Sequence, residues 1–267
     1  MQIPINAFKQ ALRDGKPQIG LWMGMTDPIA AELLASAGFD CLVFDAEHSP
    51  NDPRSVLPLL QAVAAYPLHP IVRPAHGAAE LIKLYLDIGA QTVVVPMIET
   101  AEQAARVVAA TRYPTRGIRG VASATTRASR FGQIDQYFQR ADAEMCVLVQ
   151  VESVKGLGNL ETIAAVDGVD GVFFGPADLA ASMGLIGRPT DPMVRTAVAE
   201  GIAAVKSAGK AAGTLTGDRQ LARDYLAMGA LFVAVGVDAS LLLTAAKELA
   251  SAFKGERSVA PGTTRRG

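Results

Sequence analysis

The chain has 267 residues, of which 50% are hydrophobic and 6% aromatic, and its 25 basic and 26 acidic residues leave a net charge of −1. That length is sufficient for one large domain, and the near-neutral charge gives no indication of binding to nucleic acid or to a membrane surface. No apolar run approaches the roughly 18 residues that span a bilayer, and the N-terminus lacks the pattern of a signal peptide, so a cytoplasmic location is expected. Cys41 and Cys146 are interpreted as buried, reduced thiols.

Short apolar runs that are often β-branched and bounded by Gly or Pro predict eight strands. In chain order they span residues 18–23, 41–46, 70–73, 92–96, 146–151, 171–174, 211–214 and 231–235. Helices are predicted between most of them, at 28–37, 79–88, 101–111, 193–207, 219–228 and 241–253, and about one helix is expected over 153–165. This alternation predicts a (βα)8 barrel, with a doubly wound open sheet as the alternative.

The predicted barrel domain covers residues 1–253, and the polar segment 254–267 is expected to be a mobile tail. The stretch 113–143 is too long for a simple connection. Because it is rich in Arg, Gly, Ser and Thr, it is interpreted as a functional loop with helical pieces.

Polar side chains follow the predicted strands at the end where (βα)8 barrels carry their chemistry. Taken alone, each has an ordinary structural interpretation as a turn residue, a helix cap or a surface ion pair. Six such residues at matching places favour an active site instead. They are Asp45 and His48 after the second strand, Arg73 at the end of the third, the pair Gln150 and Glu152 at the fifth, and Asp178 after the sixth.

Glu152 and Asp178 are the most informative of these residues. They end the two strands of one strand–helix–strand unit, so those strands are expected to be parallel neighbours about 5 Å apart. Two carboxylates held that close repel each other, and a shared divalent cation is the usual remedy.

A cation held by two carboxylates keeps positions open for a 2-oxo acid such as pyruvate and stabilises an enolate. Arg73 can hydrogen-bond to the developing oxyanion, and backbone N–H groups near Ala177 and Asp178 can hold the substrate carboxylate. His48 can move the proton, oriented by a carboxylate such as Asp45. This is aldol chemistry. The alternative Schiff-base route needs a lysine inside the barrel, and Lys155 is only the nearest poor candidate.

With these residues in these positions, the chain resembles the metal-dependent (class II) pyruvate aldolases of the HpcH/HpaI family. The resemblance extends from about residue 20 to residue 249, and the stretch Gly-Pro-Ala-Asp-Leu with Gln-x-Glu upstream is its most specific part. The matching stretches are 44–49, 72–74, 89–96, 116–121, 150–152, 168–179 and 229–238.

The resemblance implies Mg²⁺ or Mn²⁺, possibly Co²⁺, on Glu152 and Asp178, with no organic cofactor. It implies substrate contacts at Gln150, Ala177 and Asp178, Arg73 as transition-state stabiliser and His48 as base. It further implies that Asp87 of a neighbouring subunit contacts His48 and makes that histidine more basic. The aldehyde would meet Leu215 and the long loop around Val121, where departures from the family pattern at 122–126 leave the aldehyde unassigned. The implied assembly is a homohexamer, a trimer of dimers, with the last helix exchanged between partners.

Three alternatives remain open at the level of sequence. The first is a lyase of acyl-CoA thioesters, of the citrate lyase β-subunit or malyl-CoA type. The second is a barrel isomerase that grips phosphate with the glycine-bearing stretches 213–217 and 236–240. The third is a barrel that binds a metal and an oxo acid without catalysis.

Overall fold

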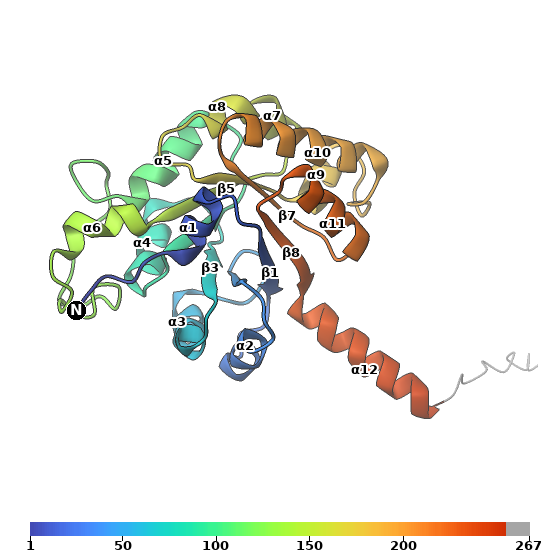
Figure 1. Cartoon of the computed structure of the whole chain (residues 1–267), viewed down its shortest axis with the longest axis horizontal. Coiled ribbons are helices and arrows are strands. Elements are labelled where there is room, and N and C mark those ends of the chain that lie inside the picture. The colour runs from blue at the N-terminus through green and yellow to red at the C-terminus, as the bar shows by residue number, and fades with distance from the viewer. Residues whose placement is uncertain (255–267) are drawn as a thin grey trace, which may run out of the picture.

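A computed structural model describes residues 1–254 of the chain. Its eight parallel strands form a closed barrel in sequence order, from β1 to β8 and back to β1 (Figure 1). The (βα)8 prediction is therefore confirmed, and an open doubly wound sheet is excluded. The strands agree with their predicted bounds to within two residues: β1 Gln18–Met23, β2 Cys41–Asp45, β3 His69–Arg73, β4 Thr92–Val95, β5 Cys146–Val151, β6 Gly171–Phe174, β7 Ala211–Leu215 and β8 Phe232–Val237.

Twelve α-helices occur in the described residues, and most of them surround the barrel. Asp27 caps α2 as its position before Pro28 suggests, accepting hydrogen bonds from the N–H groups of Ile29 and Ala30. The helices are α1 Ala7–Arg13, α2 Pro28–Ala35, α3 Pro53–Ala62, α4 Ala79–Asp87, α5 Ala101–Thr111, α6 Tyr137–Glu144, α7 Val154–Gly158, α8 Leu160–Ala164, α9 Pro176–Ser182, α10 Pro192–Ser207, α11 Arg219–Met228 and α12 Asp238–Lys254, and a 3₁₀ turn spans Val63–Ala65. None of these helices is long and apolar enough to cross a bilayer.

The interior of the barrel is a packed core. Trp22, Val43, Ile71, Phe173 and Phe232 fill it, and Phe8 of α1 joins the same cluster. Both cysteines are buried there, as predicted, and burial raises the pKa of each thiol. A filled interior leaves the ends of the strands as the places where small molecules can bind.

Helix α1 closes the end of the barrel at which the strands begin. Its Phe8 ring stacks on His69, at the start of β3, with ring centroids 5.6 Å apart. The His69 Nε2 atom lies 2.8 Å from Thr92 Oγ1, and Lys9 forms an ion pair with Asp170 at 3.2 Å. Burial lowers the pKa of His69 to about 4, so this imidazole is neutral at pH 7. The sequence placed His69 at this structural end of the barrel, away from the chemistry.

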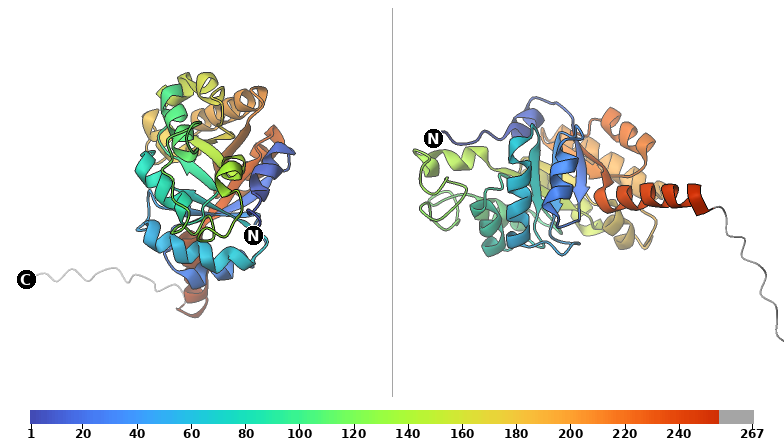
Figure 2. Two further views of the ribbon diagram at one scale, coloured as in Figure 1. Left: turned by 90° about the vertical axis from the view of Figure 1, so that its left-hand side faces the viewer. Right: turned by 90° about the horizontal axis from the view of Figure 1, so that it is seen from below.

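Helix α12 does not pack on its own barrel but points away from it (Figures 1 and 2). All of its residues after Asp238 are exposed, including Leu242, Leu249 and Phe253. The last three residues of β8 are consequently only half-buried. Apart from Lys254, which ends α12, the predicted tail 254–267 lies outside the described residues.

A hollow remains on the outer wall where an eighth helix would cover β8 and β1. It is flanked by α11 and the segment after α2. Its apolar lining includes Leu21, Phe39, Leu226 and Val235.

Candidate active site

Arg73 is held rigidly at the end of β3 by a carboxylate of the neighbouring strand. Because β2 and β3 pair in register with Asp45 opposite Arg73, the two side chains meet. Arg73 donates from Nε to Asp45 Oδ1 at 2.8 Å and from Nη2 to Asp45 Oδ2 at 2.7 Å. Its guanidinium also lies over the Trp22 ring, 4.7 Å from the centroid. Burial alone would raise the pKa of Asp45, but the bonds and charge of Arg73 outweigh it and lower that pKa.

Within residues 1–254 Asp45, which the sequence suggested as the group that orients His48, forms no hydrogen bond or ion pair with the His48 ring. Both oxygens of its carboxylate accept hydrogen bonds from Arg73, and Oδ1 also accepts hydrogen bonds from the backbone N–H groups of Glu47 and His48. The His48 side chain is 63% exposed, and the nearest carboxylate oxygen is Glu47 Oε2, 3.9 Å from Nε2. Asp45 therefore positions the arginine and the turn that carries the histidine, leaving the ring itself free.

Glu47 belongs to this cluster, although the sequence analysis assigned it no role. Its Oε2 forms an ion pair with Arg73 Nη1 at 2.8 Å. Burial raises the pKa of Glu47, and the charges of Asp45 and Asp178 act in the same direction against those of Arg73 and His48. Glu47 lies just past the end of β2, in the same polar run as Asp45 and His48, and that position was the available signal in the sequence.

Glu152 is buried at the end of β5, with both oxygens engaged. Oε1 accepts a hydrogen bond of 2.8 Å from the N–H of Met97, and Oε2 accepts from Gln150 Nε2. Met97 has a φ of 57°, a left-handed conformation that is rare without glycine and that is often found at functional sites. Burial raises the pKa of Glu152 to about 7, and the nearby charges of Glu47 and Asp178 add to that effect.

The end of β6 approaches Glu152 so closely that any side chain at position 175 would displace Glu152 and Gln150. A Cβ atom there would lie 2.4 Å from Glu152 Oε2 and 2.8 Å from Gln150 Nε2. The paired strands β5 and β6 set this approach, with Val151 opposite Phe174. Gly175 thus keeps the space beside the two polar side chains open.

Asp178 is the third residue of α9, and Gly175 is its N-cap. The alternative interpretation of Asp178 as the helix cap is therefore wrong, because Pro176 already begins the helix. The N–H groups of the first turn have no acceptors within a helix, and in the described part of the chain those of Ala177 and Asp178 donate to no other group, so they can bind a ligand.

The donor set fits a divalent cation. A buried carboxylate at Glu152, whose pKa is raised by burial and by two further carboxylates, is a charge that the protein alone leaves poorly compensated. No three His, Cys, Asp or Glu side chains within residues 1–254 come close enough to hold a metal together. A cation here would rest on two protein oxygens, as hard, oxygen-ligated ions with open positions do.

Two further residues predicted for the site, Leu215 and Asp87, lie at opposite ends of the barrel. Leu215 is the last residue of β7, at the catalytic end of the strands. Asp87 ends α4, which runs back toward the start of the strands, so it does not meet His48 of the same chain. Arg119 donates to Asp87 Oδ1 at 2.9 Å.

Val121 also belongs to the region around α4. It follows Gly120, whose Cβ position would lie 3.3 Å from Lys83 of α4, and its side chain is 64% exposed. The predicted functional loop contains one regular helix, α6, in its second half.

Two alternatives find no support in the geometry. Lys155 pairs with Glu99 at 2.9 Å and its side chain is 63% exposed, which does not suit a Schiff-base lysine. In the stretch proposed to grip phosphate, the buried Asp238 already accepts hydrogen bonds from the N–H groups of Gly24 and Met25. That stretch therefore contributes a carboxylate that binds backbone N–H groups after β1, and its negative charge does not favour a phosphate there.

Comparisons with known proteins agree with one another. A profile of the family described as HpcH/HpaI aldolase/citrate lyase matches residues 18–245. A hydroxypyruvate/pyruvate aldolase from Pseudomonas aeruginosa is 56% identical over 255 residues, 96% of this chain and 95% of that protein. A 4-hydroxy-2-oxo-heptane-1,7-dioate aldolase from Salmonella dublin is 52% identical over 254 residues, 95% of this chain and 97% of that protein.

A solved structure gives the same result at the level of the fold. The crystal structure of a HpcH/HpaI aldolase/citrate lyase family protein from Burkholderia cenocepacia J2315 superimposes with a TM-score of 0.89 and 45% sequence identity. The match covers 92% of this chain and 98% of that one.

Proposed function

The chain belongs to the HpcH/HpaI aldolase/citrate lyase family, and from this membership and the geometry of its site we propose that it is a class II pyruvate aldolase. It cleaves 4-hydroxy-2-oxo acids reversibly to pyruvate, or a related 2-oxo acid, and an aldehyde. The observation that carries the proposal is the buried Glu152, which lies within the electrostatic reach of Asp178 and of Glu47 beside Arg73. The aldolase names of the two similar proteins favour this reaction over cleavage of acyl-CoA thioesters.

In this proposal Glu152 and Asp178 hold one divalent cation, Mg²⁺ or Mn²⁺. When bound, such an ion supplies Lewis acidity at the keto group of the substrate. The ion also explains why a carboxylate with a raised pKa is kept in a buried position. No organic cofactor is needed.

Arg73 stabilises the negative charge that develops on the keto oxygen as the bond between C3 and C4 breaks. Its planar guanidinium is fixed by Asp45 and Glu47, so little reorganisation is required when the charge appears. His48 acts as the base that removes the proton from the 4-hydroxyl group. Its exposed ring is free to meet a substrate that enters from solvent.

The 2-oxo acid is held by groups on two neighbouring strand ends. The free N–H groups of Ala177 and Asp178 bind its carboxylate. Gln150 has a buried Oε1 atom with no partner in the described part of the chain. That oxygen is available to accept a hydrogen bond from a hydroxyl group on the substrate, which suits a hydroxylated 2-oxo acid as well as pyruvate.

We also propose that a second copy of the chain completes the site. The positions of Asp87 and Val121 around α4, away from the chain's own His48, support their acting in the site of another subunit. We include in the proposal a homohexamer, a trimer of dimers, in which α12 is exchanged between partners and Leu215 and Val121 contact the aldehyde. A cytoplasmic location is part of the same proposal.

Deuterium exchange tests the function directly. The protein is incubated with pyruvate in deuterated water, first with Mn²⁺ and then with excess chelator, and the methyl protons are followed by NMR. We expect exchange only with the metal, its loss in Glu152→Ala, and its retention in the control Lys155→Ala. Exchange that survives the chelator would indicate a Schiff base, and full activity of Glu152→Ala would refute the assignment.

A further inference from the structure

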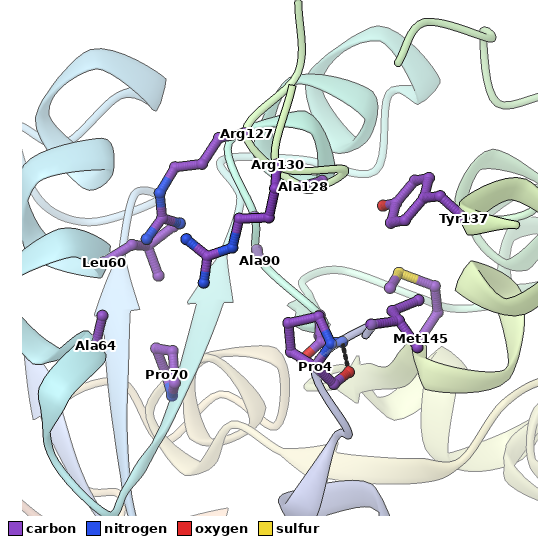
Figure 3. A pocket seen from close by; sticks show the side chains of 13 residues that line it. Pro4, Leu60, Ala64, Pro70, Ala90, Arg127, Ala128, Arg130, Tyr137 and Met145 are labelled. Carbon is purple, nitrogen blue, oxygen red and sulfur yellow. Dashed lines mark hydrogen bonds between the residues drawn. The ribbon is translucent and has the colours of Figure 1, made fainter. Parts of the chain in front are cut away.

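A second pocket lies at the end of the barrel where the strands begin, remote from the candidate active site (Figure 3). It is bounded by the end of α3, the start of β3, the turn between α4 and β4, and the loop before α6. Leu60, Ala64, Pro70 and Ala90 form an apolar wall, and the cavity measures about 130 Å³. None of the proposed catalytic residues lines it.

Two arginines of the loop, Arg127 and Arg130, project into this pocket. Figure 3 shows both guanidinium groups pointing toward the space above Pro70. Arg127 is half-buried and donates from Nη1 to the carbonyl oxygen of Ile88 at 2.9 Å. Within residues 1–254 neither arginine forms an ion pair, and no Asp or Glu lines the cavity.

Two residues at this pocket, Gly89 and Arg130, have a positive φ angle. Gly89 has a φ of +106°, and a Cβ atom there would lie 2.6 Å from Arg127 Nη1, so a larger residue would displace the guanidinium. Arg130 itself adopts a left-handed φ of 53°, which costs an ordinary residue free energy. Burial lowers the pKa of Arg127, and the positive charge of Arg130 lowers it further.

Two uncompensated guanidinium groups at a concave surface form a binding site for an anion. Arginine provides several donors in a planar fork that matches carboxylate and phosphate oxygens. We propose that this pocket binds a small oxyanion, a phosphate or a carboxylate, between Arg127 and Arg130. The cavity is smaller than the roughly 300 Å³ at which drug-sized ligand sites begin, which favours an ion of this size over a nucleotide.

Calorimetric titration with inorganic phosphate tests the proposal on the full chain after treatment with a chelator. We expect saturable binding that weakens at least tenfold in Arg130→Gln and in Arg127→Gln. The control Arg54→Gln removes an exposed arginine at the start of α3 that lies outside the pocket, and it should leave the affinity unchanged. A parallel titration with succinate distinguishes the two sources of the anion, since a tighter fit for succinate identifies a carboxylate ligand.

Several results would overturn the proposal. Undiminished binding in Arg130→Gln would locate the anion elsewhere, for example at Arg73. Failure of the unaltered protein to bind either anion, together with a changed oligomeric mass of Arg130→Gln, would show that these arginines serve a contact between chains. Because Arg127 also supports the Ile88 carbonyl, circular dichroism must show that its variant is folded, while the exposed Arg130 provides the independent test.

Discussion

At the level of single residues, Gly175 offers a test of the site that leaves every proposed ligand in place. The change Gly175→Ala introduces a Cβ atom 2.4 Å from Glu152 Oε2 and 2.8 Å from Gln150 Nε2. Because φ at this position is −93°, the backbone accepts alanine, and the clash is relieved by moving the two side chains. We expect kcat/KM for aldol cleavage to fall about 100-fold, since a shift near 1 Å in a catalytic group has that effect.

The matched control is Gly158→Ala. Gly158 ends α7, and its Cβ position has no neighbour within 4 Å. That variant should retain nearly full activity, and both proteins should unfold at similar urea concentrations. Normal activity in Gly175→Ala would show that the space beside Glu152 is not needed.

The ionisation of Glu152 predicts how metal binding depends on pH. Because its pKa is raised to about 7, the metal-free carboxylate carries a proton at lower pH, and a cation must displace that proton. The apparent affinity for Mn²⁺ should therefore be constant above about pH 7 and weaken by up to tenfold for each pH unit below it. Calorimetric titration with Mn²⁺ between about pH 5.5 and 8 measures this, and a constant affinity below pH 7 would contradict it.

The sequence identified most of the polar groups at the strand ends but not their pairing. The rule that barrel chemistry follows the strands located Asp45, Arg73, Gln150 and Glu152, and the structure puts each at that end. The sequence could not show that Asp45 accepts the hydrogen bonds of Arg73, because that contact depends on the register between β2 and β3. The hydrogen bond from Met97 depends on a left-handed turn that no residue preference would predict.

At the level of elements, the apolar runs predicted the strands better than the helices. Buried parallel strands read as continuous apolar segments, so all eight were found. Helix α3 was missed because Pro58 lies inside it, and proline normally signals a break. The helix expected after β5 is divided at Asn159 into α7 and α8, in a stretch that contains Gly156 and Gly158.

The contact between α1 and His69 at the start of β3 is expected to weaken in acid. His69 has its pKa lowered to about 4, below the ordinary value near 6.5, so folding favours the neutral ring. The contribution of the neutral ring to the free energy of unfolding is complete above about pH 6.5 and is lost as the pH falls toward 4. It is on the order of 2 kcal/mol, which is less than the full pKa shift implies because the ring is partly exposed. In His69→Gln this part of the pH dependence should disappear.

Urea unfolding of the unaltered chain and of His69→Gln between about pH 4 and 7 measures that difference. His76, which follows β3 and is exposed, provides the control, since His76→Gln should unfold with the same pH dependence as the unaltered chain. If His69→Gln lost stability on acidification as steeply as the unaltered chain, another group would be responsible.

At the level of the whole molecule, α12 and the hollow beside β8 are complementary surfaces within one chain that meet only at Leu241, in the first turn of the helix. Leu242, Leu249 and Phe253 are 61%, 64% and 84% exposed, and their spacing puts them along one side of the helix. The lining of the hollow is mainly apolar, although it includes Arg219 and Arg223, and the hollow lies where a barrel normally has its eighth helix. Exchange of α12 between two copies would bury both surfaces and account for their exposure in the single chain.

The double change Leu242→Lys with Leu249→Lys tests this exchange. Two ammonium groups cannot be buried in a hollow whose lining is apolar apart from Arg219 and Arg223 without a large cost, so light scattering after gel filtration should give a smaller assembly than for the unaltered chain. The control Lys247→Glu alters charge on the same exposed helix and should keep the larger mass. If the proposed sharing of Asp87 between copies holds, the smaller assembly should also lose aldol cleavage while binding Mn²⁺ normally, because the proposed ligands Glu152 and Asp178 are intact. A single-chain mass for the unaltered protein, or full activity of the dissociated variant, would contradict the shared site.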